Sequence, residues 1–200
     1  AKAETAEKCE ALMAPLLEKA RRRLGENYYG TDLGSPEAHA VKTLKARGLT
    51  VSAAESCTGG LIAKRITDVA GASAVFPGGV VSYTNGVKHK ILGVPDDVLE
   101  TFGAVSEPVA AHMAEGARRV AGSHLALSVT GLAGPDGDDR GNPVGTVYIG
   151  LATPTGTEVT HLHLRGSRES IRQQAADYAL ALLNRYLYNE DQGEHEHGKE

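Results

Sequence analysis

The seven residues from 54 to 60, Ala-Glu-Ser-Cys-Thr-Gly-Gly, separate an apolar run from an amphipathic one. The run 49–54 has the length and β-branched content of a strand, and apolar residues recur at helical spacing from Leu61 to Val69. This pattern predicts a strand-to-helix turn in which Ser56 is the candidate nucleophile. Such a turn lies at a helix N-terminus, where unpaired backbone N–H groups and the helix dipole favour an anion, an oxyanion or a phosphate.

The same turn has an ordinary structural interpretation. Ser56 or Thr58 would then be only a helix N-cap, and Gly59 and Gly60 would only make the turn tight. In the functional interpretation, the two glycines let a ligand approach the backbone. Cys57 is the main rival nucleophile, because a thiol at a helix N-terminus ionises readily. No histidine is evident as its partner, which favours the serine.

Composition and charge exclude several classes of protein. Two hundred residues with 41% apolar content suffice for one main hydrophobic core. The formal charge is -4, and residues 189–200 hold five acids against one lysine, so the remaining body is close to neutral and predicts no nucleic-acid surface. Cys9 and Cys57 lie in unlike contexts, which does not favour a disulfide framework. We find no signal-peptide pattern and no long apolar span, and we expect a cytoplasmic protein with no membrane partner.

Three parts of the chain differ in character. Residues 1–34 combine an amphipathic helix, expected to start near Pro15, with a turn-rich segment, and are predicted to be an N-terminal helical arm or connector. Residues 35–188 are predicted to form the folded domain. Residues 189–200 have nothing to bury and are predicted to be a disordered acidic tail. The apolar stripe of the first helix predicts self-association into a homo-oligomer.

Helices and strands alternate between residues 35 and 188. Cap residues or first-turn prolines predict helix starts at Ser35, Asn85, Pro95, Ser106 and Ser167. Strands are predicted at 49–54, 76–84, 125–130, 145–152 and 158–164, the last two as an antiparallel hairpin. The fold class predicted is α/β, a layered α/β/α sandwich on a mixed β-sheet with a C-terminal hairpin and helix.

Two helices are expected to turn an apolar face inward. Helical spacing gives these faces as Val109, Met113 and Val120 on the helix from Ser106, and Ile171, Ala175, Tyr178, Ala179 and Leu182 on the last helix. The last helix is expected to end at about Tyr188. The polar segment from Asp136 to Pro143 is expected to be a surface loop, and long loops of this kind are often functional.

A serine hydroxyl needs a base to become a nucleophile, and the usual base is histidine. None of the eight histidines is a convincing partner for Ser56. Lys88 is the alternative, because it falls in the first turn of a helix capped by Asn85, where the dipole disfavours an ammonium. Apolar residues three and four positions later indicate burial, and both effects lower the pKa of an amine. A solvated surface lysine is the competing interpretation.

Other polar residues complete the predicted site. Tyr83 is a candidate third member that relays a proton or fixes Lys88 by a hydrogen bond, unless it is an ordinary core aromatic. The glycine-rich segment after Thr130 is expected to close over the substrate and to offer backbone amides to a carbonyl oxygen or phosphate. It is not a P-loop, because no Gly-Lys-Ser/Thr follows. His161 and His163 share a strand face, but without a third ligand they do not predict a metal site.

Four blocks of the sequence carry a family resemblance. They are Ala-Glu-Ser-Cys-Thr-Gly-Gly-Leu at 54–61, Tyr-Thr-Asn at 83–85 with Lys88 and Leu-Gly-Val at 92–94, Thr-Gly-Leu-Ala-Gly-Pro at 130–135, and Pro-Val-Gly-Thr-Val-Tyr at 143–148. In this order they resemble the CinA C-terminal domain family, the nicotinamide-nucleotide amidases. The resemblance implies hydrolysis of nicotinamide mononucleotide to nicotinic acid mononucleotide and ammonia, in NAD salvage, with no cofactor and no metal.

The resemblance places the family's serine, tyrosine and lysine on Ser56, Tyr83 and Lys88. Lys88 would deprotonate Ser56, which attacks the amide carbon, while backbone amides near 57–60 or 130–131 hold the oxyanion and water later hydrolyses the acyl-enzyme. Arg168 and Arg172 are candidate phosphate ligands, with solvated helix charges as the alternative. The residues expected to bind the substrate are Glu55, Cys57, Thr58, Gly59, Gly60, Asn85, Thr130, Gly131, Ala133, Gly134, Arg168 and Arg172.

The sequence departs from the family pattern at two places, the acidic segment 136–142 and Gly-Val at 86–87. Two other classes of function stay open, a non-catalytic nucleotide-binding module and a competence or DNA-repair interaction domain. A lysine beside Tyr83 favours catalysis over both. In some relatives this domain follows a molybdopterin-binding-like domain, and residues 1–34 resemble the connector between the two. The expected partners are therefore a small nucleotide, a second copy of the chain, and such a domain in a longer chain.

Overall fold

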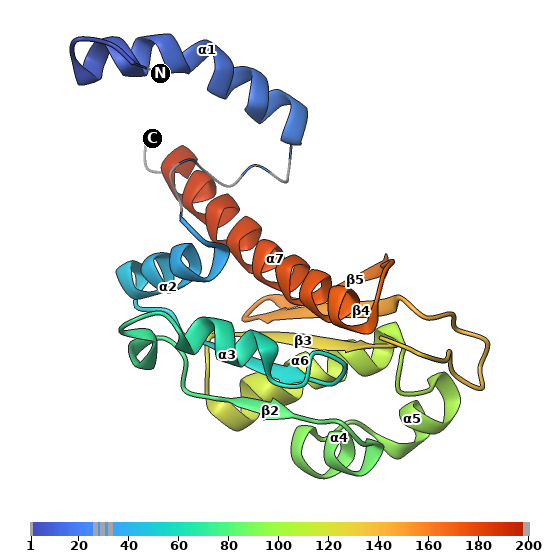
Figure 1. Cartoon of the computed structure of the whole chain (residues 1–200). Helices are drawn as coiled ribbons and strands as arrows, with labels where there is room; N and C mark the ends of the chain where they lie inside the picture. Colours follow the sequence, from blue (N-terminus) through green and yellow to red (C-terminus); the bar gives the residue numbers. More distant parts are fainter. Residues whose placement is uncertain (1, 26–27, 29–30, 32–33, 198–200) are drawn as a thin grey trace.

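A five-stranded mixed sheet organises the computed structural model, which describes residues 2–25, 28, 31 and 34–197 (Figure 1). The strand order is β2-β1-β3-β4-β5. The first three strands of this order are parallel, and the last three pair antiparallel. The strands are β1 (Val51–Glu55), β2 (Gly79–Val81), β3 (Leu125–Gly131), β4 (Thr146–Thr153) and β5 (Gly156–His163). The predicted α/β fold on a mixed sheet is confirmed, and β4 and β5 form the expected hairpin.

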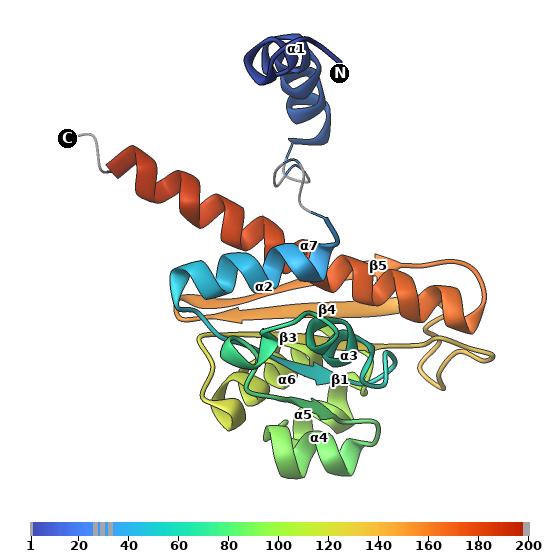
Figure 2. The same ribbon diagram turned by 60° about the vertical axis from the view of Figure 1, so that its left-hand side comes forward.

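Helices cover both faces of this sheet (Figure 2). One face carries α2 (Pro36–Arg47), α3 (Leu61–Thr67) and α7 (Arg168–His197). The other carries α6 (Glu107–Ala121), on which α4 (Asn85–Leu92) and α5 (Asp96–Phe102) pack. A short 3-10 helix, η2 (Ala72–Ala74), precedes β2. The layers are therefore helix, sheet and helix, as the sequence predicts.

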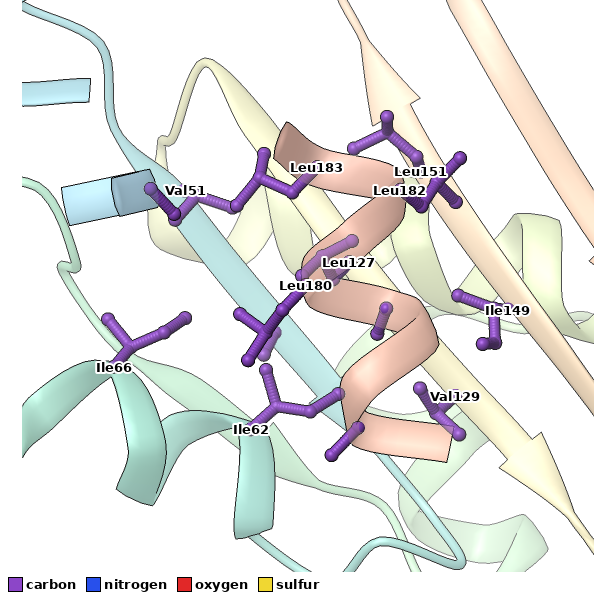
Figure 3. Close-up of a cluster of buried hydrophobic side chains, with 14 of the residues drawn as sticks. Val51, Ile62, Ile66, Leu127, Val129, Ile149, Leu151, Leu180, Leu182 and Leu183 are labelled. Atoms are coloured by element: carbon purple, nitrogen blue, oxygen red, sulfur yellow. The ribbon is translucent and has the colours of Figure 1, made fainter. Parts of the chain in front are cut away.

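The main core lies between the sheet and the layer formed by α2, α3 and α7. Leu180 of α7 and Ile62 of α3 meet Leu127 of the central strand there, each fully shielded from solvent (Figure 3). A smaller cluster on the opposite face contains Met113 of α6 and Ala126 of β3. Because helices cover both faces of the sheet at β3, its side chains are buried on both sides. This explains why its sequence is nearly continuously apolar.

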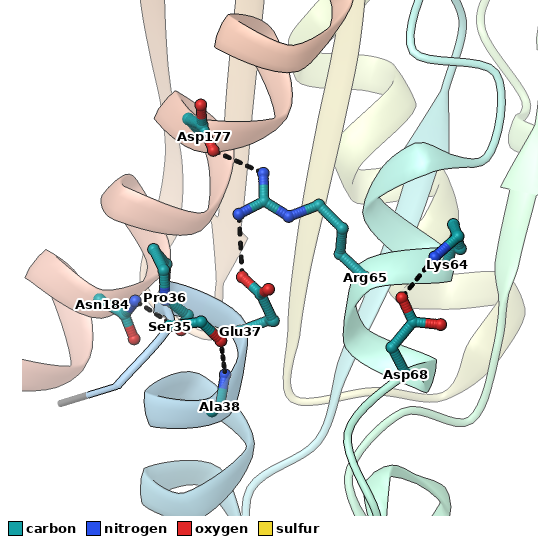
Figure 4. Close-up of polar contacts among 9 residues, drawn as sticks. All are labelled: Ser35, Pro36, Glu37, Ala38, Lys64, Arg65, Asp68, Asp177 and Asn184. Atoms are coloured by element: carbon teal, nitrogen blue, oxygen red, sulfur yellow. Dashed lines mark hydrogen bonds and ion pairs between the residues drawn. The ribbon is translucent and has the colours of Figure 1, made fainter.

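Arg65 ties the three helices of the first layer together. This α3 side chain donates to Glu37 of α2 at 2.8 Å and to Asp177 of α7 at 2.6 Å (Figure 4). Asn184 of α7 donates to the Pro36 carbonyl at 2.9 Å. These bonds fix α3, which begins directly after the candidate turn, against the long C-terminal helix.

Several helix boundaries differ from the predictions. Helix α1 (Ala6–Leu24) begins nine residues before Pro15, because Thr5 accepts a hydrogen bond from the Lys8 N–H and serves as its N-cap. It buries no residue and stands apart from the sheet layers (Figures 1 and 2). Thr84, not Asn85, is the N-cap of α4. Among the described residues, no helix is both long and apolar enough to cross a membrane.

The C-terminal helix also runs beyond its predicted end. Helix α7 continues past the predicted end at Tyr188 to His197, and residues 198–200 lie outside the described part. Adding residues to an existing helix costs far less than starting one, which lets a polar segment extend it. Tyr178 and Val120 are exposed at 50% and 53%, not inward as predicted, because each lies at the margin of its apolar face.

A close backbone contact seats α4 on α6. A Cβ on Gly116 of α6 would overlap the Leu92 carbonyl at the end of α4. The same carbonyl accepts a hydrogen bond from Arg119 at 2.7 Å. Gly93 then ends α4 in the left-handed region at φ 69°. Only a residue without a side chain at position 116 lets α4 approach this closely.

We expect Gly116→Ala to lower the melting temperature by roughly 4–10 °C, because overpacking costs about 1–3 kcal/mol and α4 must move away from α6. Gly86→Ala is the matched control. Gly86 lies in α4, where a Cβ would meet no other atom within 4 Å, so alanine should be neutral or slightly stabilising there. Thermal unfolding followed by circular dichroism measures both. Equal melting temperatures for the two variants would contradict the contact.

Candidate active site

The turn after β1 lies where two parallel strands end together. The Ser56 N–H donates to the Val129 carbonyl of β3 at 2.9 Å, which continues the β1–β3 ladder to the edge of the sheet. In α/β sheets, ligands bind outside the carboxyl ends of the parallel strands. Gly60, with φ 95°, then turns the chain into α3. The predicted strand-to-helix turn is present, and it places Ser56 at this edge.

Lys88 reaches Ser56 from the other side of the edge. Its Nζ lies 3.1 Å from Ser56 Oγ and 2.7 Å from the Ser82 carbonyl oxygen. The side chain is 1% exposed, and burial lowers the pKa of the Lys88 amine to about 8. As an ammonium, Lys88 donates to the serine. Once neutral, the amine has a lone pair that can take the serine proton at the same distance.

Sequence reasoning missed Ser82 as a member of the site. Its carbonyl directs the Lys88 amine, and its own N–H donates to the Glu55 carbonyl at 2.7 Å. Ser82 contributes its backbone carbonyl, which any residue type could supply, so the residue's identity does not predict this role. The only available signal is that Ser82 lies near the end of the predicted strand 76–84 and comes six residues before the lysine.

Glu55 has a different role from the predicted one of substrate ligand. Its carboxylate accepts the backbone N–H groups of Gly60 at 3.0 Å, Ile62 at 3.0 Å and Ala63 at 2.8 Å, and the residue is 1% exposed. The start of α3 is therefore occupied by the protein's own anion. A carboxylate at this position satisfies helix donors that would otherwise be free.

Arg172, predicted as a phosphate ligand, instead bonds to the turn. Its Nε donates to the Cys57 carbonyl at 3.1 Å, and one terminal nitrogen donates to the Thr58 carbonyl at 2.8 Å. Gly59 permits this approach, since a Cβ there would lie 3.2 Å from the guanidinium and the residue has φ +62°. The turn is held by α7 across more than a hundred residues of sequence.

The N–H groups of Cys57 and Thr58 are the two backbone donors of the turn that remain available. The neighbouring N–H groups are occupied, since that of Gly59 donates to the Ser56 carbonyl at 3.0 Å and that of Leu61 to the Thr58 carbonyl at 3.4 Å. In the part of the chain that the structure describes, no backbone or side-chain oxygen accepts the N–H of Cys57 or of Thr58. Unpaired N–H groups directly after a nucleophile are the usual components of an oxyanion hole.

Cys57 is a poor rival to Ser56 as nucleophile. The thiol is 5% exposed, and burial raises its pKa to about 11, although the nearby charges of Lys88 and Arg172 oppose this. The reactive form of cysteine is the thiolate. Because this environment disfavours the thiolate at neutral pH, the structure favours the serine.

Tyr83 lies at the mouth of the site. It is 58% exposed, so it is not a core aromatic, and its hydroxyl accepts a hydrogen bond from Arg168 at 2.9 Å. Arg168 also donates to the Gly134 carbonyl at 2.5 Å. The hydrogen bond predicted between Tyr83 and Lys88 is absent among the described residues, because the lysine amine is directed to Ser56 and Ser82. Arg168 thus joins the tyrosine to the glycine-rich segment.

The glycine-rich segment is held in place by internal contacts. Thr130, predicted to bind substrate, is 1% exposed and donates its hydroxyl to the Ala104 carbonyl at 2.7 Å. Gly131 packs against the backbone of β4, and Ala133 is 4% exposed. These positions shape the edge of the sheet, and their side chains offer no free polar group to a ligand. Asn85, in contrast, is exposed at the first turn of α4.

The loop 136–142 is pinned to α5. Asp138 accepts the N–H groups of Arg140 at 3.1 Å and Asn142 at 2.9 Å. Arg140 donates to the Thr101 carbonyl at 2.8 Å and to the Glu100 carbonyl at the end of α5. Arginine at a helix C-terminus satisfies free carbonyls there. These hydrogen bonds hold the loop in one position beside the glycine-rich segment.

An open hollow of about 360 Å³ adjoins the turn, lined by Leu61, Arg168, Glu169, Arg172 and Gln173. It lies between α3 and the first turns of α7.

The two histidines of β5 form no metal site within the described part of the chain. His161 stacks on Tyr148 with 4.2 Å between ring centroids. Among the residues described, no group of three or more potential metal ligands comes together.

These features define an α/β domain with a buried serine-lysine pair at the carboxyl edge of a mixed sheet. A family model described as the CinA C-terminal domain matches residues 34–187, and the chain belongs to this family. The resemblance seen in the four sequence blocks is confirmed.

Relatives of known sequence and structure agree with this assignment. CinA-like proteins of Kosmotoga olearia and Geobacter sulfurreducens are 46% and 48% identical over 94% of this chain. The chain spans 45% of the length of each. A competence/damage inducible protein, CihA, of Agrobacterium tumefaciens is similar in structure with a TM-score of 0.73 and 39% identity, covering 78% of this chain and 96% of that one. A competence or damage-inducible protein of Enterobacter asburiae gives a TM-score of 0.75 at 30% identity, covering 79% and 99%.

Proposed function

We propose that this chain hydrolyses the carboxamide of nicotinamide mononucleotide to nicotinic acid mononucleotide and ammonia. The observation that carries the proposal is the buried contact of 3.1 Å between Lys88 Nζ and Ser56 Oγ. A binding module would have no need to bury a lysine beside a serine and to lower its pKa. The substrate is proposed from the family resemblance, and the residues supply the chemistry.

In the proposed mechanism, neutral Lys88 takes the hydroxyl proton of Ser56, and Oγ attacks the amide carbon. The oxyanion that forms accepts hydrogen bonds from the N–H groups of Cys57 and Thr58. Lys88 then returns its proton to the leaving nitrogen, which departs as ammonia and leaves an ester on Ser56. The amine next deprotonates a water, which hydrolyses this ester, while the Ser82 carbonyl keeps the amine directed at the reacting atoms.

Residues at the mouth suit the rest of the nucleotide. The exposed ring of Tyr83 offers an aromatic face to the positively charged pyridinium ring of the substrate. Arg168 is exposed and lines the adjoining hollow, where it can turn toward a phosphate. Arg172 is the weaker phosphate candidate, since its guanidinium already bonds two carbonyls of the turn.

Ammonia release from nicotinamide mononucleotide, with a chelator present, tests the proposal. We expect turnover of the nucleotide and little turnover of free nicotinamide, which lacks the ribose and phosphate. If the protein binds the nucleotide by calorimetry yet releases no ammonia, it is a binding module and the proposal is wrong.

Turnover is expected to rise with pH and to level off above a midpoint near pH 8, because Lys88 must be neutral and burial lowers the pKa of its amine to about 8. The fraction of neutral amine grows as the pH increases through that value, so kcat/KM increases in the same direction. Cys57→Ala is the control and should keep the same midpoint. A midpoint near the ordinary lysine value of 10.5 would contradict a general base whose pKa is lowered by burial.

A further inference from the structure

Two charged side chains hold the nucleophile turn, and neither touches the reacting atoms. Glu55 accepts three N–H groups at the start of α3, and Arg172 donates to two carbonyls of the turn. Hydrogen bonds to ionised groups are roughly twice as strong as those between neutral groups. The turn is thus fixed by an anion where it enters α3 and by a cation at the carbonyls of Cys57 and Thr58.

The carbonyls that Arg172 binds determine where the next N–H groups point. In a trans peptide, the C=O and N–H of one peptide group are antiparallel. Arg172 bonded to the Cys57 carbonyl therefore directs the Thr58 N–H away from α7, and this N–H has no acceptor in the described part of the chain. The following residue, Gly59, has few steric limits on its backbone. Without the arginine, the Cys57–Thr58 peptide group loses its hydrogen bond to Arg172, and the Thr58–Gly59 group keeps only the bonds of the Gly59 and Leu61 N–H groups within the turn.

We propose that Glu55 and Arg172 are positioning residues that keep the peptide groups of Cys57 and Thr58 in the orientation an oxyanion hole requires. The inference rests on the proposed amide hydrolysis. It assigns Arg172 to transition-state geometry, not to phosphate binding, and Glu55 to the turn, not to the substrate.

Arg172→Met tests this role by kinetics. Removing one oxyanion donor costs about 10²–10³ in kcat, so we expect at least a tenfold loss of kcat with KM within threefold of the wild type. The pH midpoint should not move, because Lys88 keeps its surroundings. Arg172→Lys should recover only part of the loss, since an ammonium cannot span both carbonyls as a guanidinium does. Arg185→Met is the matched control on α7, where Arg185 pairs with Glu158, and it should leave kcat unchanged.

A rise in KM with unchanged kcat would make Arg172 a substrate ligand and overturn the inference. A normal kcat with only a lower melting temperature would make it a purely structural contact, with the same result. Either pattern differs from failure of the proposed function, in which the wild type itself releases no ammonia.

Amide hydrogen exchange gives a readout that needs no substrate. Glu55→Gln keeps the side-chain volume but removes the charge, and we expect at least tenfold faster exchange at the amides of Gly60, Ile62 and Ala63. Arg172→Met should accelerate exchange at the Gly59 amide, which bonds to the Ser56 carbonyl. Unchanged exchange in both variants would refute the positioning role. If exchange is faster in the variants but the wild type has no amidase activity, the positioning role of Glu55 and Arg172 is supported and only the proposed function is rejected.

Discussion

Ser56→Ala is expected to lower turnover of nicotinamide mononucleotide by about 10⁴-fold or more, the scale of losses when a serine nucleophile is removed. The change deletes the oxygen on which the proposed ester forms. Cys57→Ala, at the next residue, should stay within about tenfold of the wild type, since burial raises the pKa of that thiol to about 11 and keeps it protonated. Ammonia release measures both.

The two variants are matched, because each removes one heteroatom from the same buried turn. A structural defect in the turn would affect them similarly, so comparable melting temperatures are part of the expected result. Loss of turnover in the cysteine variant alone would assign the nucleophile to Cys57. Substantial activity in the serine variant would rule out the ester on Ser56.

Lys88→Met is expected to abolish turnover and, at neutral pH, to stabilise the fold. Methionine matches the length of the lysine stem and needs no desolvation of a charge. The folded-state pKa of about 8, against 10.5 for a free lysine, corresponds to a cost of about 3 kcal/mol for burying the ammonium. The Ser82 carbonyl loses its hydrogen-bond donor in this variant, which offsets about 1–2 kcal/mol of the expected stabilisation. The net gain is about 1–2 kcal/mol, a few degrees in melting temperature.

The gain should depend on pH in a defined direction. Between about pH 8 and 10.5 the unfolded chain binds the lysine proton more readily than the folded chain, so wild-type stability rises with pH in this window. Below about pH 8 the cost is fully present, and above 10.5 it is gone. The advantage of methionine should therefore shrink between thermal unfolding at about pH 7 and at about pH 10. Lys90→Met, on the exposed side of the same helix, is the control and should show no such change.

Local sequence signals predicted much of the fold and the pairing of Ser56 with Lys88. The polar turn between a β-branched run and a helical pattern placed Ser56 at a helix N-terminus, and the apolar neighbours of Lys88 indicated its burial. Both signals depend on spacing within one element. The helix-sheet-helix layering followed from the alternation of such elements, and the family assignment agrees with it.

What the sequence did not predict depends on contacts between distant segments. Arg172 bonds the turn from a position 115 residues away, and Arg168 reaches Tyr83 over 85 residues. Neither partner can be read from local spacing. Glu55 is a local exception: the resemblance placed it among the substrate ligands, whereas its carboxylate accepts the N–H groups of Gly60, Ile62 and Ala63 at the start of α3. The Ser82 carbonyl belongs to the backbone and leaves no mark in residue type.

Rapid-quench mass spectrometry of the protein during turnover tests whether Ser56 is the nucleophile. The serine-lysine mechanism predicts a nicotinate mononucleotide ester on Ser56 Oγ, located by fragmentation of the peptide that contains residues 56 and 57. The adduct should be absent in Lys88→Met, in which nothing activates the hydroxyl. A thioester on Cys57, or ammonia release with no adduct on either residue, would contradict the serine-lysine mechanism.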